Sequence, residues 1–385
     1  MEMQWKGCAG VFFNSIYIAI GLTKSRESHS RPARNLPQSQ IFILLKILFA
    51  IQGTGNGHLS RATDVYPELC RHGDVDVLIS GIQASIDVPF PVKHHLYGMS
   101  FMMGDRGGVD MWATARKLRL PAFLRDARRL QVKQYDLVVN DFEPVSAWAA
   151  KMQGVPCISL SHQWAVMHVQ APRPELSDWK GQAVLKRYAP CVDGYGFHFK
   201  AYGKKIFTPV IRREVRDLVV SDKGHIAVYL PSYADDVLIS FFQRFEDVRW
   251  EVFSRHCKEA SVKGNVVIRP VENEAFLSSM ASSQGVICGA GFETPAEALY
   301  LGKKLLVIPM EGQYEQQCNA AALATLNVPS IRKISLKYYD RIRFWLSGSM
   351  TQVRVDYPDQ TGKIVDMLIA DFQQNYQRSR HIEQA

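Results

Sequence analysis

The feature that most constrains the fold is an apolar run that ends in two glycines and is followed at once by a helical pattern. Residues 285–288 suit a buried parallel strand, and Gly289 and Gly291 allow a sharp turn before a short helix with Thr294 at its start. Gly302 ends that helix, and residues 305–309 form a second apolar strand. The chain is therefore predicted to contain a βαβ unit of a parallel sheet, with its ligand side at the carboxyl ends of the strands.

The turn between this strand and helix is suited to an anion. The first N–H groups of a helix have no partner within the helix, and the helix dipole is positive at that end, so a diphosphate is a typical ligand. Gly289, Ala290 and Gly291, together with the helix start at Thr294, are the predicted phosphate-binding residues.

Length and composition favour two globular domains. The 385 residues are 47% hydrophobic and 22% charged, which is enough to bury large cores. The net charge of +9 suits nucleic acid, anionic lipid or phosphorylated small molecules, but no pattern of a nucleic-acid-binding module accompanies it, so nucleic acid is not an expected partner. The seven cysteines are scattered and form no C-x-x-C pair, which favours reduced thiols in a cytoplasmic protein over disulfides or a zinc site.

Residues 1–44 differ from the rest of the chain. The apolar segment at residues 11–22 is too short to span a bilayer, which needs about 20 residues. Residues 24–40, rich in Ser, Arg, Pro and Gln, are typical of an unstructured connector. We expect residues 1–44 to be an extension, either a linker or the result of an upstream translation start, and the folded protein to begin near residue 45.

A second glycine-rich turn follows the apolar run at residues 47–51. The turn is Gly53-Thr54-Gly55-Asn56-Gly57-His58, and a helix is predicted after it over residues 59–70. Histidine stands where a dinucleotide-binding turn has its third glycine, and no acidic residue ends the next strand, so NAD is disfavoured. The three glycines of the turn, Gly53, Gly55 and Gly57, allow the backbone to approach a ligand closely, and His58 can carry a proton near neutral pH. The alternative is a loop histidine bonded locally.

Polar residues follow two further predicted strands. Asp141 and Glu143 come after the strand at residues 135–140, and His162 comes after the strand at residues 155–160. Because the ends of parallel strands share one edge of a sheet, these residues are candidates for the same site as His58. Alternatively, the two acidic residues cap the helix that begins near Pro144, and His162 bonds a backbone carbonyl.

Residues 116–133 form a predicted basic amphipathic helix, interrupted near its middle by Pro121. Such a helix can lie on anionic lipid, although a solvated face on a core-packed helix has the same pattern. Residues 82–113 show few clear elements and are predicted to be an exposed loop that includes His94 and His95.

The second half of the chain repeats the α/β pattern of the first. Residues 217–225 are polar and suit a linker, and strands are predicted at 226–230, 250–253 and 266–270, with helices at 235–245 and 273–281. The predicted fold is α/β, with two Rossmann-like doubly wound domains that face each other across a cleft. The expected domains are residues 45–216, residues 217–350, and a C-terminal helix within residues 351–385 that packs back on the first domain.

From about residue 46 onward, the chain resembles the GT-B glycosyltransferases. It is similar to the branch with the N-acetylglucosaminyltransferase that forms lipid II, and to a bacterial and archaeal family with the turn Gly-x-Gly-x-Gly-His, an Asp-Phe-Glu and a Ser-His-Gln. The donor signature of these enzymes is met by Gly289, Gly291, Thr294, Glu297, Gly302, Pro309, Gln316, Asn319 and Ala320.

The resemblance implies a nucleotide-sugar donor, a UDP-hexose or UDP-N-acetylhexosamine. Glu297 would accept bonds from the ribose hydroxyls, although Thr294 and Glu297 also match a helix capping box. Glu315 and Gln316 would bond the sugar hydroxyls, with Asn319 on the same helical face. Gly55, Asn56, Gly57, Glu143 and His162 would lie on the acceptor side.

The implied reaction is direct, inverting transfer to an acceptor hydroxyl. His58 would be the base, and Asp141 would orient or replace it. No cofactor is expected, and no metal, because helix and amides would stabilise the leaving diphosphate and no D-x-D motif is present. The acceptor is unidentified; a lipid-linked one would place the enzyme in cell-envelope or glycolipid synthesis, at the inner face of the membrane. The alternatives are a UDP-sugar 2-epimerase and a non-catalytic nucleotide-sugar-binding protein.

Overall fold

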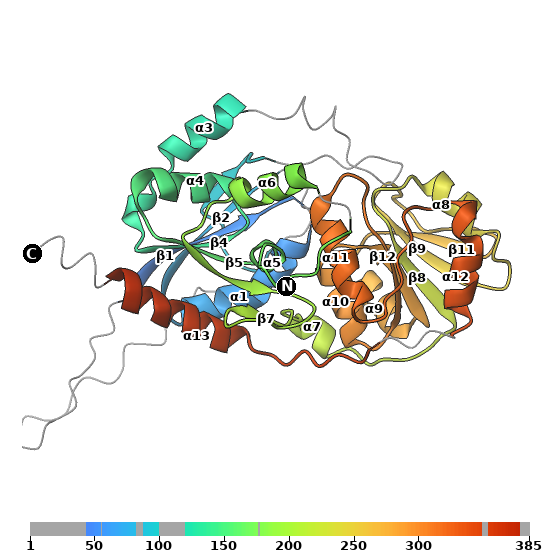
Figure 1. The fold of residues 1–385 in the computed structure, drawn as a ribbon. Coiled ribbons are helices and arrows are strands. Elements are labelled where there is room, and N and C mark those ends of the chain that lie inside the picture. Colours follow the sequence, from blue (N-terminus) through green and yellow to red (C-terminus); the bar gives the residue numbers. More distant parts are fainter. Residues whose placement is uncertain are drawn as a thin grey trace, which may run out of the picture. The chain divides into compact units, whose positions relative to one another are not determined.

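The computed structural model describes residues 44–54, 56–81, 88–99, 120–175, 178–348 and 353–377. Gly55, most of the predicted N-terminal extension and residues 116–119 of the basic segment lie outside these ranges. The described chain contains two sheets that have helices on both faces, one sheet in each half (Figure 1).

The N-terminal sheet has seven strands in the order β3-β2-β1-β4-β5-β6-β7, and every neighbouring pair is parallel. The strands are β1 (Leu45–Gln52), β2 (Gly73–Ser80), β3 (His94–Leu96), β4 (Leu137–Asp141), β5 (Cys157–Ser161), β6 (Asp193–Phe197) and β7 (Ile206–Phe207). The helices are α1 (Asn56–Cys70), α3 (Leu120–Arg129), α4 (Pro144–Gln153), α5 (His162–Val166), α6 (Trp179–Tyr188) and α7 (Arg213–Arg216), with a 3-10 turn at Val132–Gln134.

The C-terminal sheet has six strands in the order β10-β11-β9-β8-β12-β13, with only the β10–β11 pair antiparallel among them. The strands are β8 (His225–Tyr229), β9 (Arg249–Ser254), β10 (Ser261–Lys263), β11 (Val266–Pro270), β12 (Gly285–Gly289) and β13 (Lys304–Ile308). The helices are α8 (Asp235–Phe242), α9 (Asn273–Ser282), α10 (Glu293–Tyr300), α11 (Tyr314–Ala324), α12 (Tyr339–Leu346) and α13 (Thr361–Phe372), with a 3-10 turn at Leu336–Tyr338 and a π-helical turn at Gln373–Gln377.

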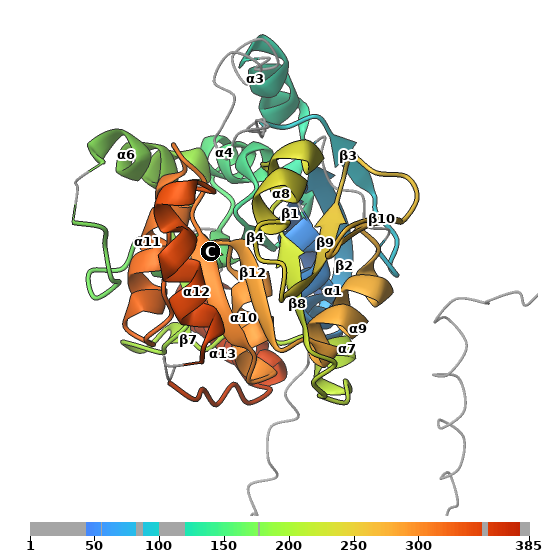
Figure 2. The ribbon, with the colours of Figure 1, turned by 90° about the vertical axis from the view of Figure 1, so that its right-hand side faces the viewer.

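Both sheets are covered on both faces, which explains why their central strands are apolar almost throughout. In β8, Ile226 and Val228 pack in one cluster with α8 and α12, whereas Ala227 packs in another with α9 and α10 (Figure 2). In β1, alternate residues likewise face α1 on one side and α4 on the other. The prediction of two Rossmann-like α/β domains is confirmed by this architecture.

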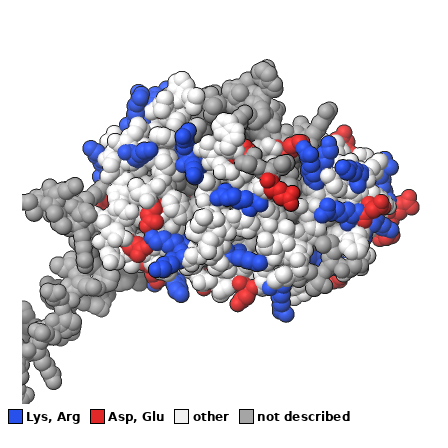
Figure 3. Space-filling view, viewed as in Figure 1, with Lys and Arg blue, Asp and Glu red and all other residues white. Residues whose placement is uncertain are grey.

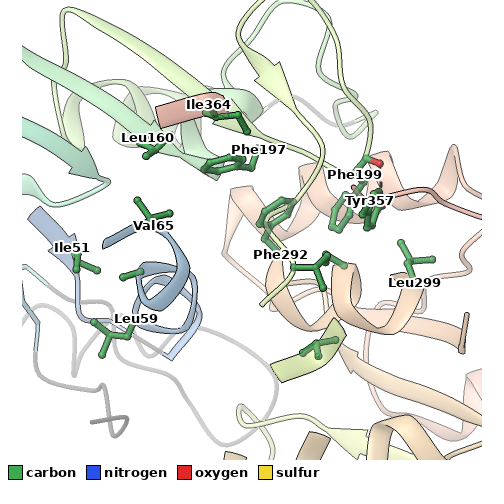
Figure 4. Packing of buried hydrophobic residues seen from close by; sticks show 14 of the residues in the cluster. Ile51, Leu59, Val65, Leu160, Phe197, Phe199, Phe292, Leu299, Tyr357 and Ile364 are labelled. Atoms are coloured by element: carbon green, nitrogen blue, oxygen red, sulfur yellow. Dashed lines mark hydrogen bonds between the residues drawn. The ribbon is translucent and has the colours of Figure 1, made fainter. Parts of the chain in front are cut away.

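The largest hydrophobic cluster runs through both halves. Figure 4 shows Phe197 and Phe199, at the end of β6 and beyond it, near Phe292 at the start of α10. The Phe199 and Phe292 ring centroids are 5.2 Å apart. Helix α13 contributes Ile364 to the same cluster, and its Asp371 accepts a hydrogen bond of 2.5 Å from the Tyr195 hydroxyl in β6. The C-terminal helix therefore contacts the N-terminal sheet.

Several local predictions were wrong. His94 and His95 lie in the short edge strand β3 and not in a loop, because β3 pairs with residues 78–80 of β2. Pro121 does not interrupt a helix at its middle: it is the second residue of α3, where the missing N–H breaks no helical bond. Strand β6 and helix α6 were not predicted. None of the helices in the described ranges has both the length and the apolar composition of a membrane span.

Candidate active site

In the N-terminal sheet, the direction in which successive strands are added reverses between β1 and β4. From β1 the chain continues to β2 on one side, and β4 on the other side leads on to β5, β6 and β7. Ligands of open parallel sheets bind beyond the carboxyl ends of the strands at such a point. Helix α1 begins at Asn56, just after β1, and Asp141 is the last residue of β4. The fold therefore places His58 and Asp141 at the position where a site is expected.

His58 and Asp141 form a hydrogen-bonded pair. His58 Nδ1 lies 2.9 Å from Asp141 Oδ1, and the His58 side chain retains 15% exposure whereas that of Asp141 retains 2%. Because Nδ1 faces the carboxylate, Nε2 is the ring nitrogen that remains for a substrate. A histidine held by a buried carboxylate through one nitrogen is suited to accept a proton at the other.

Arg61 completes this cluster and was missed by the sequence analysis. Its Nη2 donates to both oxygens of Asp141 at 2.7 Å and lies 3.2 Å from His58 Nδ1. Its Nη1 donates to Glu293, the first residue of α10, so the cluster joins the two halves of the chain. Arg61 stands three residues after His58, on the same face of α1, and that spacing was the available signal.

The pKa values of the pair are shifted by these neighbours. Burial lowers the pKa of His58, but the charge and hydrogen bond of Asp141 outweigh it, and the net pKa of His58 is raised. Burial raises the pKa of Asp141, but Arg61 and then His58 outweigh it, and the net pKa of Asp141 is lowered. The electrostatics therefore favour an ionised Asp141 beside a histidine of increased basicity.

Glu143 caps helix α4. Its two carboxylate oxygens accept from the backbone N–H groups of Val145 and Ser146 at 2.7 and 2.6 Å, and one also accepts from the Ser80 hydroxyl at 2.5 Å. The side chain is fully buried, and burial raises the pKa of its carboxyl. The alternative considered from the sequence, that Glu143 caps the helix beginning near Pro144, is confirmed. A role for Glu143 in acceptor binding stays a prediction.

His162 lies between the two halves. Its Nδ1 donates to the backbone carbonyl of Phe197 at 2.8 Å, its Nε2 is 2.7 Å from Asn319 Oδ1, and its ring stacks on Phe292 at 3.9 Å. The residue is 1% exposed, and burial lowers its pKa. The carbonyl contact considered from the sequence is present, and the contact with α11 was not foreseen. Acceptor binding by His162 stays a prediction.

The predicted phosphate turn leads from β12 into α10. Gly289 is the last residue of β12, and nothing lies within 4 Å of the place where a side chain on Gly291 would begin. No side chain caps the first N–H groups of α10. Asn319 fixes the turn, because its Nδ2 donates to the carbonyl of Ala290 at 3.0 Å. An uncapped helix start beside an open glycine is the arrangement that binds a phosphate.

The capping-box alternative for Thr294 and Glu297 was wrong. Thr294 is the second residue of α10 and not its cap, because the helix begins at Glu293. Glu297 is 4% exposed and accepts from Arg212 Nε at 2.7 Å. Burial raises the pKa of Glu297 and Arg212 opposes this. The carboxylate is thus held by an arginine from the segment between the two sheets.

The predicted sugar-binding residues lie at the start of α11. Gln316 Oε1 accepts from the backbone N–H of Met310, just after β13, at 2.8 Å. Glu315 Oε2 accepts from Gln163 Nε2 at 3.1 Å, and Gln163 is adjacent to His162. The structure therefore brings Glu315, predicted to bond the donor sugar, into contact with α5 of the N-terminal half.

Asn56 and Gly57 begin helix α1. A side chain on Gly57 would overlap with the carboxylate of Glu293, so a larger residue there would displace that carboxylate. Among the residues that the structure describes, no cluster of three or more His, Cys, Asp or Glu is arranged to hold a metal ion.

A family model described as "Glycosyl transferase family 1" matches residues 45–342 of the chain. The chain belongs to this glycosyltransferase family. The match spans the N-terminal sheet, the C-terminal sheet and the loops that carry the site. The prediction of a GT-B glycosyltransferase from the donor signature is confirmed.

Solved structures of glycosyltransferases share the fold. MurG from Acinetobacter baumannii is 16% identical, with 84% of this chain and 99% of that chain covered and a TM-score of 0.51. Arabidopsis thaliana UGT89C1, solved in complex with UDP-L-rhamnose, is 14% identical, with 85% and 99% covered and a TM-score of 0.52. At this identity the comparison supports the fold of the glycosyltransferase and not its substrates. A search of curated proteins gave no match.

Proposed function

We propose that this glycosyltransferase moves a hexosyl or N-acetylhexosaminyl group from a UDP-sugar to an acceptor hydroxyl, with inversion at the anomeric carbon. The observation that carries the proposal is the His58–Asp141 pair at the switch point, joined through Arg61 to the first residue of α10. This contact supports a proposed base at His58 near the predicted phosphate turn.

The donor would lie on the C-terminal half. The turn at Gly289, Ala290 and Gly291 would bind the diphosphate with the uncapped N–H groups of α10, and Glu297 would accept from the ribose hydroxyls. The amide nitrogen of Gln316 and the carboxylate of Glu315 would bond hydroxyls of the sugar. UGT89C1, a structural neighbour, was solved with UDP-L-rhamnose, which is consistent with a UDP-sugar in this fold.

In the proposed reaction His58 Nε2 takes the proton of the acceptor hydroxyl, whose oxygen forms a bond to the anomeric carbon. The bond from that carbon to the phosphate oxygen breaks, and UDP leaves with the electron pair. Asp141 orients the ring through Nδ1 and stabilises the imidazolium that forms. The helix start and backbone N–H groups stabilise the leaving diphosphate, so the proposal needs neither a metal nor a cofactor.

We further propose that the acceptor enters a cavity of about 360 Å³ in the N-terminal half. Residues of β5, α5 and α6 line it, and Phe142, adjacent to Asp141, is also part of the lining. The lining is largely apolar, with the hydroxyls of Ser159 and Ser161 among the polar groups, as in most sites for small organic ligands. An acceptor with an apolar body and a hydroxyl fits this lining.

A membrane surface is a further proposed partner. Arg125, Arg128 and Arg129 of α3 are exposed, and Leu120 and Leu124 of the same helix remain 50% and 45% exposed. Figure 3 shows basic side chains in the region where Figure 1 places α3. Exposed leucines beside arginines suit contact with anionic lipid. This contact and a lipid-linked acceptor would place the enzyme on the cytoplasmic side of a membrane, in envelope or glycolipid synthesis.

Membership of a glycosyltransferase family favours transfer over the 2-epimerase and the non-catalytic alternatives. A screen tests the proposal: the full chain is incubated with radiolabelled UDP-sugars and lipid extracts, and labelled products are separated by chromatography. A labelled glycolipid or glycoside with UDP released is the expected result. Conversion of UDP-N-acetylglucosamine to its 2-epimer without an acceptor, or binding of UDP-sugars with no product in any pool, would support an alternative instead.

The acceptor cavity can be tested in the same assay. Leu185→Asp introduces a charge into the lining, and we expect lower transfer to apolar acceptors with unchanged UDP binding. Val192→Asp is the matched control, since Val192 is 63% exposed and outside the lining. Equal transfer by the two variants would remove the cavity from the acceptor path.

A further inference from the structure

Arg61 has a role that the proposed reaction does not yet assign. The residue is 2% exposed, and its guanidinium contacts Asp141, Glu293 and His58. It also lies over the Phe197 ring, with 5.7 Å from Cζ to the ring centroid. A buried arginine with this many charged partners fixes their positions, because the N–H donors of its planar guanidinium point in fixed directions.

The groups around His58 come from three elements. Asp141 belongs to β4, Arg61 to α1 and Glu293 to α10, and each of these charged groups acts on His58. Two of the three are carboxylates, and Arg61 is the only cation among them. With Arg61 and a neutral His58 the four groups carry a net charge of −1, from two carboxylates and one guanidinium. Without Arg61 the charge would be −2, which would favour the protonated imidazolium.

A protonated His58 cannot act as a base. Asp141 must be close enough to orient the ring, yet its charge also holds a proton on that ring, and Glu293 acts in the same direction. Arg61 counters both carboxylates while leaving the contact between His58 and Asp141 in place, since Nη2 donates to Asp141 and Nη1 to Glu293.

We propose that Arg61 is a positioning residue that holds Asp141 for His58 and offsets part of the charge of Asp141 and Glu293, so that a larger fraction of His58 is available as a neutral base. The assignment of His58 as a base rests on the proposed function, but the electrostatic role of Arg61 can be measured without any substrate. Burial also lowers the pKa of His58, and the Arg61 charge adds to that effect.

The experiment is a histidine NMR titration of the full chain. His58 is identified among the eleven histidines by the signal that is lost in His58→Gln. We expect the pKa of His58 to be higher in Arg61→Gln than in the wild type, and near the wild-type value in Arg61→Lys, which keeps the charge. Arg216→Met is the matched control, because Arg216 donates to the backbone carbonyls of Ile211 and Tyr357 and does not act on His58.

Glu293→Gln gives a second measurement that does not require replacing the arginine. It removes a carboxylate that raises the pKa of His58, so the pKa should fall. A pKa of His58 that is unchanged or lower in Arg61→Gln, or unchanged or higher in Glu293→Gln, would overturn the proposal.

Measurements of UDP release distinguish the electrostatic role of Arg61 from the proposed glycosyltransferase function. UDP release by Arg61→Gln should be lower than wild type near neutral pH and should approach the wild-type rate as the pH rises, because His58 then loses its proton. A loss of the same size at every pH would show that Arg61 has only a structural role. If the titration gives the expected shifts and the wild type releases no UDP from any UDP-sugar, the electrostatic role stands and the proposed function fails.

Discussion

At the scale of single residues, two buried carboxylates separated by one residue have opposite properties. Asp141 faces Arg61 and His58, and its pKa is lowered, whereas Glu143 faces only neutral donors and its pKa is raised by burial. Phe142 between them has a φ of 57°, a left-handed conformation that is uncommon for a non-glycine residue. Such strain often occurs at functional sites, and here it accompanies the change of direction between the end of β4 and the cap of α4.

Asp141→Asn tests the pair directly. Asp141 raises the pKa of His58, so removal of its charge should lower that pKa and move the acid limb of the pH–rate profile to lower pH. The rate on the plateau should fall at least about 10-fold, because the ring is less basic and less well oriented. The measurement is UDP release from a UDP-sugar as a function of pH. An acid limb at the same pH as in the wild type would contradict a coupled pair.

At the scale of elements, the two glycine-rich strand-to-helix turns could be predicted from the sequence. Each has an apolar run before the glycines and a helical pattern after them, and β1–α1 and β12–α10 follow these patterns closely. The start of α10 was predicted less well, since local spacing made Thr294 the cap. The partner of Glu297 is Arg212, 85 positions away, and no local pattern indicates such a contact.

Strand β6 could not be predicted because tertiary packing overrides its composition. Two of its five residues, Gly194 and Gly196, have a low preference for strands. A side chain on Gly194 would clash with Trp164 and Ser159, and one on Gly196 would clash with Ala165. The glycines are therefore required by the close packing of α5 on the sheet, and that packing is not visible in a local sequence window.

The cap of helix α4 gives a prediction at this scale. Glu143→Ala removes the acceptor for two helix N–H groups and for the Ser80 hydroxyl, and it should lower the free energy of unfolding by about 2 kcal/mol. Urea unfolding followed by circular dichroism measures the change. Glu246→Ala, at an exposed position, is the control and should leave the free energy nearly unchanged. Equal stability of the two variants would argue against the capping role.

At the scale of the whole molecule, side chains from the two halves of the chain meet each other, and one of these pairs joins a residue predicted for the acceptor to one predicted for the donor. His162 contacts Asn319, and Gln163 contacts Glu315. Arg61 contacts Glu293, and Arg212 contacts Glu297. The sequence indicated one member of most of these pairs, but it indicated neither Arg61 nor how the residues pair, because the members of each pair are more than 80 positions apart.

Glu297→Ala tests whether the C-terminal half binds the donor nucleotide. A ligand at about 100 times its Kd stabilises the folded state by about 2.7 kcal/mol, so UDP should raise the unfolding free energy of the wild type. Loss of the ribose contact should remove most of this stabilisation at the same UDP concentration. Asp247→Ala is the control, because Asp247 is an exposed carboxylate paired with Arg343. Full stabilisation of Glu297→Ala by UDP would place the ribose elsewhere.

The central claim is that His58 is the base of a UDP-sugar glycosyltransferase. The most direct measurement compares wild type and His58→Ala in two assays on the same preparations, calorimetric binding of UDP and release of UDP from the UDP-sugar that the screen identifies. We predict nearly equal UDP affinities and a turnover at least about 100-fold lower in His58→Ala. Turnover near the wild-type rate with intact UDP binding would contradict the claim.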